Sequence, residues 1–206
     1  MMFYTIEKSV SAELIEKKSK FIADLFYIQN QEEAENKIKE IKKKYHDAKH
    51  HCFAYITFDE EKKKIERCSD DGEPSGTAGA PMLELLRGKQ LCNVLIVVTR
   101  YFGGILLGTG GLVRAYAGAT KLALEEANFV QKQDGKELEI VLEYSEIENF
   151  KYYCRKNTIN IVKEEYSDNV IFLVELTNEK FEKIKNEIES FNLKVIKIDK
   201  IKEKYI

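Results

Sequence analysis

Apolar and polar positions alternate along the last third of the chain in short regular runs. Residues 138–142 carry apolar side chains at every second position, which predicts a strand with one buried face. A Ser-Asp-Asn turn at 167–169 separates two further strand-like runs, 159–166 and 170–176. The chain closes on a fourth run, 193–201, in which isoleucine alternates with charged residues.

Two segments between these strands carry apolar residues at helical spacing. Ser145 followed by Glu148 forms a capping box, which predicts a helix whose Phe150 and Cys154 share one face. A second helix is predicted over 181–191, where apolar residues recur at intervals of three, four and three. The resulting order, βαββαβ, is typical of a ferredoxin-like domain. Its polar residues fall on solvent faces, so we interpret it as a small packing or binding module.

The first 130 or so residues mix strand-like and helical patterns. An almost unbroken apolar run at 91–99 predicts a strand covered on both faces. Helices are predicted at 34–45, at 78–86 and at 112–127, the last rich in alanine and glycine. Shorter strand-like runs lie at 3–6, 13–15, 21–28, 52–58 and 65–68. This mixture indicates an α+β fold.

Glycine and proline mark where the chain divides. Ten of the 11 glycines and both prolines lie between Gly72 and Gly118, so special backbone geometry is concentrated in the first part. The remaining glycine lies in a polar stretch without periodic apolar positions, 131–136, which predicts a linker or tight connection. We therefore expect two domains, 1–131 and 132–206.

Composition narrows the class of protein. Of the 206 residues, 44% are hydrophobic and 33% are charged, which favours a folded chain over a disordered one. The formal net charge of −2 excludes a strong overall attraction to nucleic acid or membranes. No apolar run approaches the ~20 residues of a transmembrane helix, and the first residues lack the apolar core of a secretion signal. The four cysteines show no C-x-x-C spacing, and without a secretion signal we expect reduced thiols in a cytoplasmic protein. We also expect no membrane association and no cofactor.

The segment 67–81 combines three carboxylates, Asp70, Asp71 and Glu73, with turn-forming residues. Clustered carboxylates on a tight loop suit a divalent cation, but the spacing lacks the terminal Glu of an EF-hand. Alternatively, the aspartates accept hydrogen bonds from the backbone amides of a rigid turn, and Thr77 caps the following helix. We favour this structural role, or an ordered recognition loop, over a metal site.

The predicted buried strand leads into a glycine-rich segment, TRYFGGILLGTGGLVRAY. Exposed amides before a helix suit a phosphate, but the third glycine of G-x-G-x-x-G and the Gly-Lys-[Ser/Thr] of a P-loop are missing. What remains is an arginine–aromatic–glycine pattern that suits the bases and phosphates of single-stranded or looped RNA. Alternatively, Tyr101 and Phe102 are buried and Arg100 pairs with Asp70 or Asp71.

The remaining reactive residues predict neither a catalytic nor a zinc site. His50 and His51 precede Cys52, but neighbouring strand residues point to opposite faces, and no close cysteine pair completes a zinc site. The motif around Ser75 resembles a nucleophile elbow only superficially, because two residues rather than one separate the first glycine from the serine. We expect no catalytic residue and no bound metal.

Two long motifs resemble the YigZ/Impact family. They are Ser-Asp-Asp-Gly-Glu-Pro-Ser-Gly-Thr-Ala-Gly at 69–79 and Val-Thr-Arg-Tyr-Phe-Gly-Gly at 98–104, which continues into Gly-Gly-Leu-Val-Arg-Ala-Tyr at 110–116. His-Cys-Phe-Ala-Tyr at 51–55 also resembles the family's strand before the acidic loop. The resemblance covers the N-terminal domain, and the remainder resembles the second domain of the bacterial two-domain members.

This resemblance implies both a fold and a field of action. It implies an N-terminal α/β sandwich similar to domain 2 of ribosomal protein S5 and to the fourth domain of the translocating elongation factor. A ferredoxin-like domain follows. Eukaryotic Impact proteins are associated with translational control through protein partners, and similarity of shape favours contact with RNA or the ribosome, which is fold analogy.

Our leading hypothesis is a non-enzymatic regulator linked to translation, which binds RNA, the ribosome or a translation-associated protein through its N-terminal domain. The expected contact residues, with guanidinium and ring groups facing solvent, are Arg100, Tyr101, Phe102, Gly103, Gly104, Gly108, Gly110, Gly111, Arg114 and Tyr116. The expected supporting loop consists of Asp70, Asp71, Gly72, Glu73 and Thr77. Two alternatives stay open: a small metal-assisted hydrolase that uses the acidic loop, and a protein-interaction module without nucleic acid.

Overall fold

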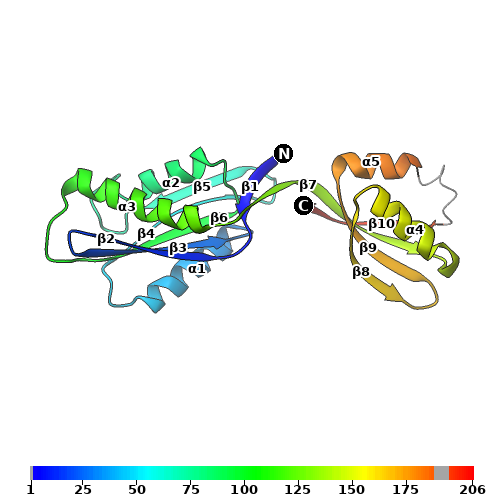
Figure 1. Cartoon of the computed structure of the whole chain (residues 1–206), viewed down its shortest axis with the longest axis horizontal. Helices are drawn as coiled ribbons and strands as arrows, with labels where there is room; N and C mark the ends of the chain where they lie inside the picture. Colours follow the sequence, from blue (N-terminus) through cyan, green and yellow to red (C-terminus); the bar gives the residue numbers. More distant parts are fainter. Residues whose placement is uncertain (1, 188–194) are drawn as a thin grey trace. The chain divides into compact units, whose positions relative to one another are not determined.

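The chain forms two compact units, each with its own sheet and helices. The computed structural model describes residues 2–187 and 195–206 (Figure 1). The first unit spans Phe3–Gln131 and the second contains Lys132–Ile206. The end of the last predicted helix, from residue 188 on, and the predicted strand start at 193–194 lie outside the described residues.

A five-stranded antiparallel sheet forms the centre of the first unit. Its strands lie in the order β2 (Val10–Glu16), β3 (Ser19–Tyr27), β6 (Val94–Tyr101), β4 (His50–Phe58) and β5 (Lys64–Ser69). The central strand β6 is buried from residue 94 to residue 100. This confirms the prediction that the apolar run forms a strand covered on both faces.

Helices cover both faces of this sheet. α2 (Gly79–Gly88) and α3 (Gly108–Glu126) lie on one face, and α1 (Gln31–Lys44) lies on the other (Figure 1). The apolar stripe of α1 packs with Leu95 and Val97 in one core cluster. Because strand residues alternate between faces, the other set of β6 side chains, which includes Val98 and Arg100, faces α2 and α3.

β6 begins later and ends later than the apolar run predicts. Leu91 and Cys92 lie instead beside β1 (Met2–Ile6), where the Cys92 amide donates a hydrogen bond to the Tyr4 carbonyl at 2.9 Å. Asn93 then adopts a φ of 56°, which interrupts the extended backbone. At its other end the strand continues to Tyr101, so part of the glycine-rich motif is strand rather than loop.

α3 lies close against the sheet because its buried face is built from small residues. Ala115, Ala119 and Ala123 are buried on this face, and a Cβ atom at Gly118 would lie 3.2 Å from the Leu14 side chain of β2. The helix starts at Gly108, four residues before the predicted start, so the glycines form its first turn. Within residues 2–187 and 195–206, no helix combines the length and apolar character needed to cross a membrane.

The polar stretch predicted as a linker is part of a strand. β7 (Phe129–Leu142) runs through it, with β9 (Val170–Thr177) on one edge and β10 (Val195–Tyr205) on the other. Gly135 pairs with both neighbours, and a Cβ atom there would lie 2.0 Å from the Ile206 side chain. The linker prediction is wrong because neighbouring strands satisfy the backbone, which no periodic apolar pattern reveals.

The second unit has the strand order β10, β7, β9 and β8 (Asn160–Tyr166), with every pair antiparallel. α4 (Ile147–Lys156) and α5 (Asn178–Glu187) pack into one core with the inner residues of β7 and β9. This strand order, together with two helices in one core, confirms the ferredoxin-like βαββαβ fold predicted from the alternation of apolar residues.

The capping box predicted for α4 is absent. A short 3-10 turn, η1 (Tyr144–Glu146), precedes the helix and contains Ser145. The N-cap residue is Glu146, whose side chain makes no capping hydrogen bond. The Ser145 prediction is wrong because the chain enters the helix through this tight turn, which places the serine one residue too early.

Candidate functional site

Asp70 holds the acidic loop together by binding backbone amides. Its Oδ2 accepts a hydrogen bond from the Gly76 amide, and its Oδ1 accepts bonds from the Ala78 and Gly79 amides, all at 2.9 Å. Burial raises the pKa of Asp70, but these amides outweigh it and hold the pKa below its ordinary value. The interpretation that an aspartate caps backbone amides here is confirmed.

Thr77 does not cap α2, contrary to the sequence prediction. Its hydroxyl donates a 2.6 Å hydrogen bond to the Pro74 carbonyl, within the loop itself. The N-cap residue is Ala78, and the carboxylate of Asp70, eight residues earlier, takes over the capping role. The cap prediction is wrong because it considers only the residues next to the helix.

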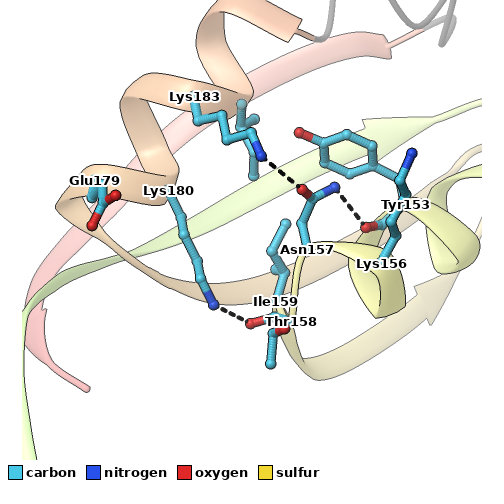
Figure 2. Close-up of a pocket in the computed structure, with 9 residues that line it drawn as sticks. Tyr153, Lys156, Asn157, Thr158, Ile159, Glu179, Lys180 and Lys183 are labelled. Atoms are coloured by element: carbon cyan, nitrogen blue, oxygen red, sulfur yellow. Dashed lines mark hydrogen bonds between the residues drawn. The ribbon is translucent and has the colours of Figure 1, made fainter.

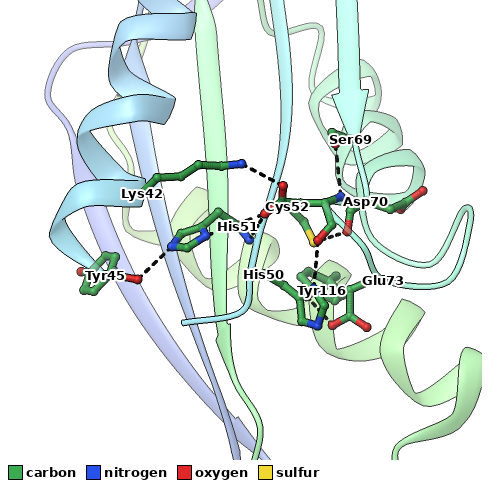
Figure 3. Close-up of polar contacts among 10 residues, drawn as sticks. Lys42, Tyr45, His50, His51, Cys52, Ser69, Asp70, Glu73 and Tyr116 are labelled. Atoms are coloured by element: carbon green, nitrogen blue, oxygen red, sulfur yellow. Dashed lines mark hydrogen bonds and ion pairs between the residues drawn. The ribbon is translucent and has the colours of Figure 1, made fainter. Parts of the chain in front are cut away.

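Asp71 ties the loop to α1 and β4. Its carboxylate accepts hydrogen bonds from the His51 amide at 2.7 Å and from Lys42 Nζ at 2.8 Å, and its carbonyl oxygen lies 2.9 Å from His50 Nδ1. Figure 3 shows Lys42 reaching toward the loop beside His51 and Cys52. Asp71 has a φ of 42° and Gly72 a φ of 87°, so two successive left-handed residues turn the chain here.

Glu73 connects the acidic loop to the glycine-rich motif. Its Oε1 accepts a 2.6 Å hydrogen bond from Arg100 Nη1 and a 2.8 Å hydrogen bond from the Tyr116 hydroxyl. The side chains of Glu73 and Arg100 are 4% and 8% exposed, so the ion pair is buried. Burial and the neighbouring Cys52 and Glu73 raise the pKa of Tyr116 far above its usual range, which keeps its hydroxyl a donor.

This geometry corrects the expected position of two contact residues. Arg100 is 7% exposed and Tyr116 is fully buried, so neither group faces solvent. β6 extends through Arg100 and turns its side chain toward α3, where the Tyr116 ring packs edge-on against Phe21 at 5.2 Å. The alternative pairing of Arg100 with Asp70 or Asp71 is also wrong, because Glu73 is the partner.

The two aromatic residues after Arg100 differ in exposure. Tyr101 is half-buried, and its hydroxyl donates a 2.7 Å hydrogen bond to Asp47, which raises the pKa of Tyr101 to about 12. Phe102 is 56% exposed, and the Arg100 guanidinium lies 5.6 Å from the centre of its ring. Phe102 therefore covers the buried ion pair with one part of its ring and presents the rest to solvent.

Gly103 fixes the loop after β6. Its amide donates a 3.1 Å hydrogen bond to Ser19 Oγ. A Cβ atom at this position would lie 2.0 Å from the Lys18 carbonyl carbon, in the turn between β2 and β3. Gly104 and Gly108 follow with φ of 84° and 70°. Glycine is favoured at these two positions by its left-handed backbone conformation rather than by a close neighbour.

The loop presents a solvent-facing surface that we name the glycine-loop surface. It consists of Phe102, Ile105, Leu106, residues 108–110 and Arg114, all exposed, with the exposed Lys17–Lys18 turn beside Gly103. Arg114 Nη1 lies 3.8 Å from the Cβ position of Gly110, so the guanidinium lies over the first turn of α3. Leu107 is the N-cap residue of α3, with no side-chain cap and no acidic residue in the first turn.

Sequence comparison assigns the chain to a family. The Impact N-terminal domain matches residues 17–124, and a domain of unknown function, DUF1949, matches residues 140–191. The IMPACT family member YvyE of Bacillus subtilis is 36% identical over 170 residues, which cover 82% of this chain and 77% of that protein. The chain belongs to the Impact family.

Further comparisons agree with this membership. The IMPACT family member YigZ of Escherichia coli is 34% identical over 176 residues, covering 85% of this chain and 86% of that protein. A crystal structure described as that of a hypothetical protein has 31% identity and a TM-score of 0.66, with 98% of each chain covered. The two motifs that resemble the Impact family are those that meet at the Glu73–Arg100 ion pair.

Two parts of the glycine-loop surface of this Impact-family chain were not predicted. Leu106 is 83% exposed and Ile105 is 42% exposed, although apolar residues usually indicate a buried segment. The signal in the sequence is an Ile-Leu-Leu run inside a glycine-rich loop, without strand or helix periodicity. Among the described residues, no group of three or more His, Cys, Asp or Glu side chains is placed to hold a metal ion.

We expect only one of the four cysteines of this Impact-family chain to react in the native state. Cys52 is buried and donates its thiol to the Asp70 carbonyl at 3.0 Å, and burial raises its pKa to about 12. Cys92 and Cys154 are also buried, whereas Cys68 is exposed. Native mass spectrometry after iodoacetamide at pH 8 should show one adduct at Cys68, and the denatured chain should show four. A second native adduct would contradict the buried placement.

Proposed function

We propose that this Impact-family protein acts in translational control by binding RNA of the ribosome through the glycine-loop surface. Membership of the Impact family supports translation as the field of action. The proposal is further supported by an uncapped helix start, an exposed arginine and an exposed aromatic ring, which lie within one loop and the first turns of the helix that follows it. The following contacts favour RNA as the bound molecule.

The first turn of α3 offers a place for a phosphate. Its amides have no side-chain cap, and residues 108–110 are exposed. α3 has 19 residues, so its N-terminus carries the positive end of a long helix dipole. Arg114, one turn along, adds a guanidinium that forms paired hydrogen bonds with phosphate oxygens.

Phe102, in the loop that leads into α3, offers a stacking surface. An exposed aromatic ring stacks on any base, and such stacking contributes ~1–3 kcal/mol per base. The ring cannot retreat freely, because Gly103 behind it is anchored to Ser19 and lies against the Lys18 backbone. The single observation that carries the proposal is the exposed Phe102 ring on a loop that Gly103 anchors and that leads into the uncapped start of α3.

The acidic loop supports the surface rather than forming a hydrolytic centre. Asp70 is engaged by three backbone amides, Asp71 by Lys42 and the His51 amide, and Glu73 by Arg100 and Tyr116. The bond from Arg100 to Glu73 fixes the guanidinium that lies 5.6 Å from the centre of the Phe102 ring. We therefore assign the loop to stability and orientation of the binding surface.

Replacing Phe102 by alanine together with Arg114 by glutamine should weaken co-sedimentation of the full chain with ribosomes. Loss of one stacked base predicts about a 5- to 150-fold lower affinity. Loss of the Arg114 phosphate contact should also reduce the dependence of binding on salt by roughly one unit of log–log slope. Binding should be measured between 50 and 200 mM salt, where phosphate contacts have large effects.

The matched control is Tyr152→Ala with Arg155→Gln, which removes an exposed aromatic ring and an exposed arginine from α4. This control should co-sediment like the wild-type chain. Equal binding of the Phe102/Arg114 variant and the wild type would remove the site assignment. Binding that depends on these two residues but survives nuclease digestion would show that the partner is a protein instead.

A further inference from the structure

Three connections of the first unit lie at the same end of its sheet. The turn at residues 17–18 joins β2 to β3 there, α1 ends there and leads into β4, and β6 ends there and leads through the glycine loop into α3. Figure 1 shows these connections together at the end of the unit where α3 starts. We name residues 16–18, 43–49 and 102–110, together with Arg114, the basic end.

Contacts through Tyr101 join the end of α1 to the glycine loop. Tyr101 is the last residue of β6, and its hydroxyl donates a 2.7 Å hydrogen bond to Asp47, which lies between α1 and β4. Lys49 follows two residues later and directly precedes His50, which pairs with Arg100 of β6. The chain after α1 therefore lies beside the strand end from which the glycine loop starts.

The lysines of this region fall into two groups. In the first group each ammonium lies within 4 Å of a carboxylate: Lys20 pairs with Glu13 at 2.5 Å, Lys42 with Asp71 at 2.8 Å and Lys44 with Asp24 at 3.8 Å. The second group consists of Lys17, Lys18, Lys43 and Lys49, which are all exposed. Among the described residues, none of these four side chains has an ion pair or a hydrogen bond. Their positive charges therefore face solvent without a partner.

The first unit is electrically polarised as a result. At the basic end the four unpaired lysines and Arg114 outnumber two exposed carboxylates, Glu16 and Asp47, in a chain whose formal net charge is −2. At the opposite end, a hollow of about 480 Å³ between the start of α1 and the β4–β5 connection is lined by three carboxylates, and no lysine or arginine is among its described lining residues. An anionic partner is attracted to the basic end and repelled by the hollow.

A cluster of lysines in the second unit differs from the basic end. Lys180 and Lys183 line a pocket of about 290 Å³ between α4 and α5. Figure 2 shows Lys180 Nζ donating a 2.6 Å hydrogen bond to the Thr158 carbonyl, and Lys183 Nζ 3.4 Å from Asn157 Oδ1. These ammonium groups are already engaged within the unit, whereas those of the basic end are not.

We propose that RNA bound at the glycine-loop surface continues past Tyr101 to the end of α1, and that the four unpaired lysines bind its phosphates. This inference rests on the proposed function and extends its surface. RNA carries one phosphate per nucleotide, which matches cations supplied by separate segments, and each phosphate neutralised by a lysine releases counterions. Such contacts position the RNA backbone and raise affinity without sequence preference. The exposed Phe102 ring, in the same surface, favours RNA over an acidic protein because it can stack on a base.

Replacing Lys43 and Lys49 together by glutamine should weaken co-sedimentation of the full chain with ribosomes. Between 50 and 200 mM salt, the log–log salt dependence of binding should become shallower by roughly two units, one for each lysine. Binding at the low-salt end should fall by about tenfold or more. Both lysines are exposed and unpaired, so the unfolding midpoint should stay that of the wild type.

The matched control is Lys8→Gln with Lys121→Gln. It also removes two exposed lysines from the first unit, one just before β2 and one in the second half of α3, both away from the basic end. This control should bind like the wild type. A control as weak as the Lys43/Lys49 variant would show that overall charge, rather than the basic end, determines binding.

Asp47→Asn provides a change in the opposite direction. Asparagine keeps an oxygen that can accept the Tyr101 hydroxyl and removes a negative charge from the middle of the proposed surface. Binding should therefore become tighter, which a misfolded variant cannot produce. Unchanged or weaker binding of a folded Asp47→Asn chain would contradict a path of RNA past Tyr101.

The Phe102/Arg114 variant, measured alongside, separates this inference from the proposed function. Weak binding of that variant, with wild-type binding and salt dependence of the Lys43/Lys49 variant, would overturn the extension and leave the glycine-loop surface as the whole site. Wild-type binding of the Phe102/Arg114 variant would remove the proposed function and this inference with it. Binding that needs Lys43 and Lys49 but survives nuclease digestion would identify an acidic protein as the partner and overturn the assignment to RNA.

Discussion

Replacing Glu73 by alanine is expected to destabilise the chain by about 3–5 kcal/mol, the cost of leaving a buried charge without its partner. Arg100 and Tyr116 both donate to Glu73 Oε1, so one substitution removes the acceptor of two buried donors. Arg100 Nε already has no hydrogen-bond partner among the described residues. The measurement is the free energy of unfolding of the first unit, obtained from urea unfolding of the full chain monitored by circular dichroism.

The matched control is Glu84→Ala. Glu84 also pairs with an arginine, Arg87, but its side chain is 67% exposed. Exposed ion pairs contribute ~0–1 kcal/mol, so this variant should unfold almost like the wild type. Equal effects of the two substitutions would contradict the burial of the Glu73–Arg100 pair.

A double substitution separates the lost ion pair from lost packing. Glu73→Ala with Arg100→Met removes both charges and keeps an unbranched side chain between the rings of Phe21 and Phe102. Since removal of one partner leaves an uncompensated charge and removal of both does not, the double variant should recover stability relative to Glu73→Ala. A double variant less stable than the single one would show that packing, not charge, dominates.

The architecture follows from the sequence more fully than the site does. Alternating apolar residues in 138–142 and 170–176 determine which strand faces are buried, and they led directly to the ferredoxin-like unit. The almost unbroken apolar run at 91–99 likewise predicts a strand covered on both faces, as β6 is. A buried strand face requires apolar side chains, and these lie at neighbouring or alternate positions of the sequence. Such a pattern can therefore be recognised without knowledge of tertiary contacts.

The position of Arg100 could not be obtained in the same way. An arginine after an apolar strand is typical of an exposed strand end, but β6 continues for two residues and gives Arg100 the same face as Val98. The choice of Glu73 as partner depends on how the acidic loop folds. That fold rests on the left-handed conformations of Asp71 and Gly72 and on the long-range cap by Asp70.

The glycine-loop surface also depends on contacts that are remote in sequence. In the sequence, Gly103 and Gly104 look alike. In the structure, a Cβ atom at Gly103 would lie 2.0 Å from the Lys18 backbone, whereas a Cβ atom at Gly104 would have no atom within 4 Å. Only the packing of the β2–β3 turn against Gly103 distinguishes the two. The same contact brings Lys17 and Lys18 next to a loop that follows them by more than 80 residues.

Replacing Gly103 by alanine should therefore cost about 3 kcal/mol, at the upper end of the range for overpacking. The added Cβ would lie 2.0 Å from the Lys18 carbonyl carbon and 2.4 Å from the Ser19 amide nitrogen. Both atoms belong to backbone, so no side-chain rotation relieves the clash. Urea unfolding of the full chain measures the cost, and Gly88→Ala, where nothing lies within 4 Å of the Cβ position, is the control.

The Gly103 substitution should also displace the glycine loop, because the hydrogen bond from its amide to Ser19 Oγ cannot survive the shift. Phe102 would then lose its fixed position in the loop, and ribosome co-sedimentation should fall toward the level of the Phe102/Arg114 variant even at temperatures where the chain stays folded. Stability within about 0.5 kcal/mol of the wild type, as for ordinary surface substitutions, would show that the β2–β3 turn yields and that Gly103 does not anchor the loop.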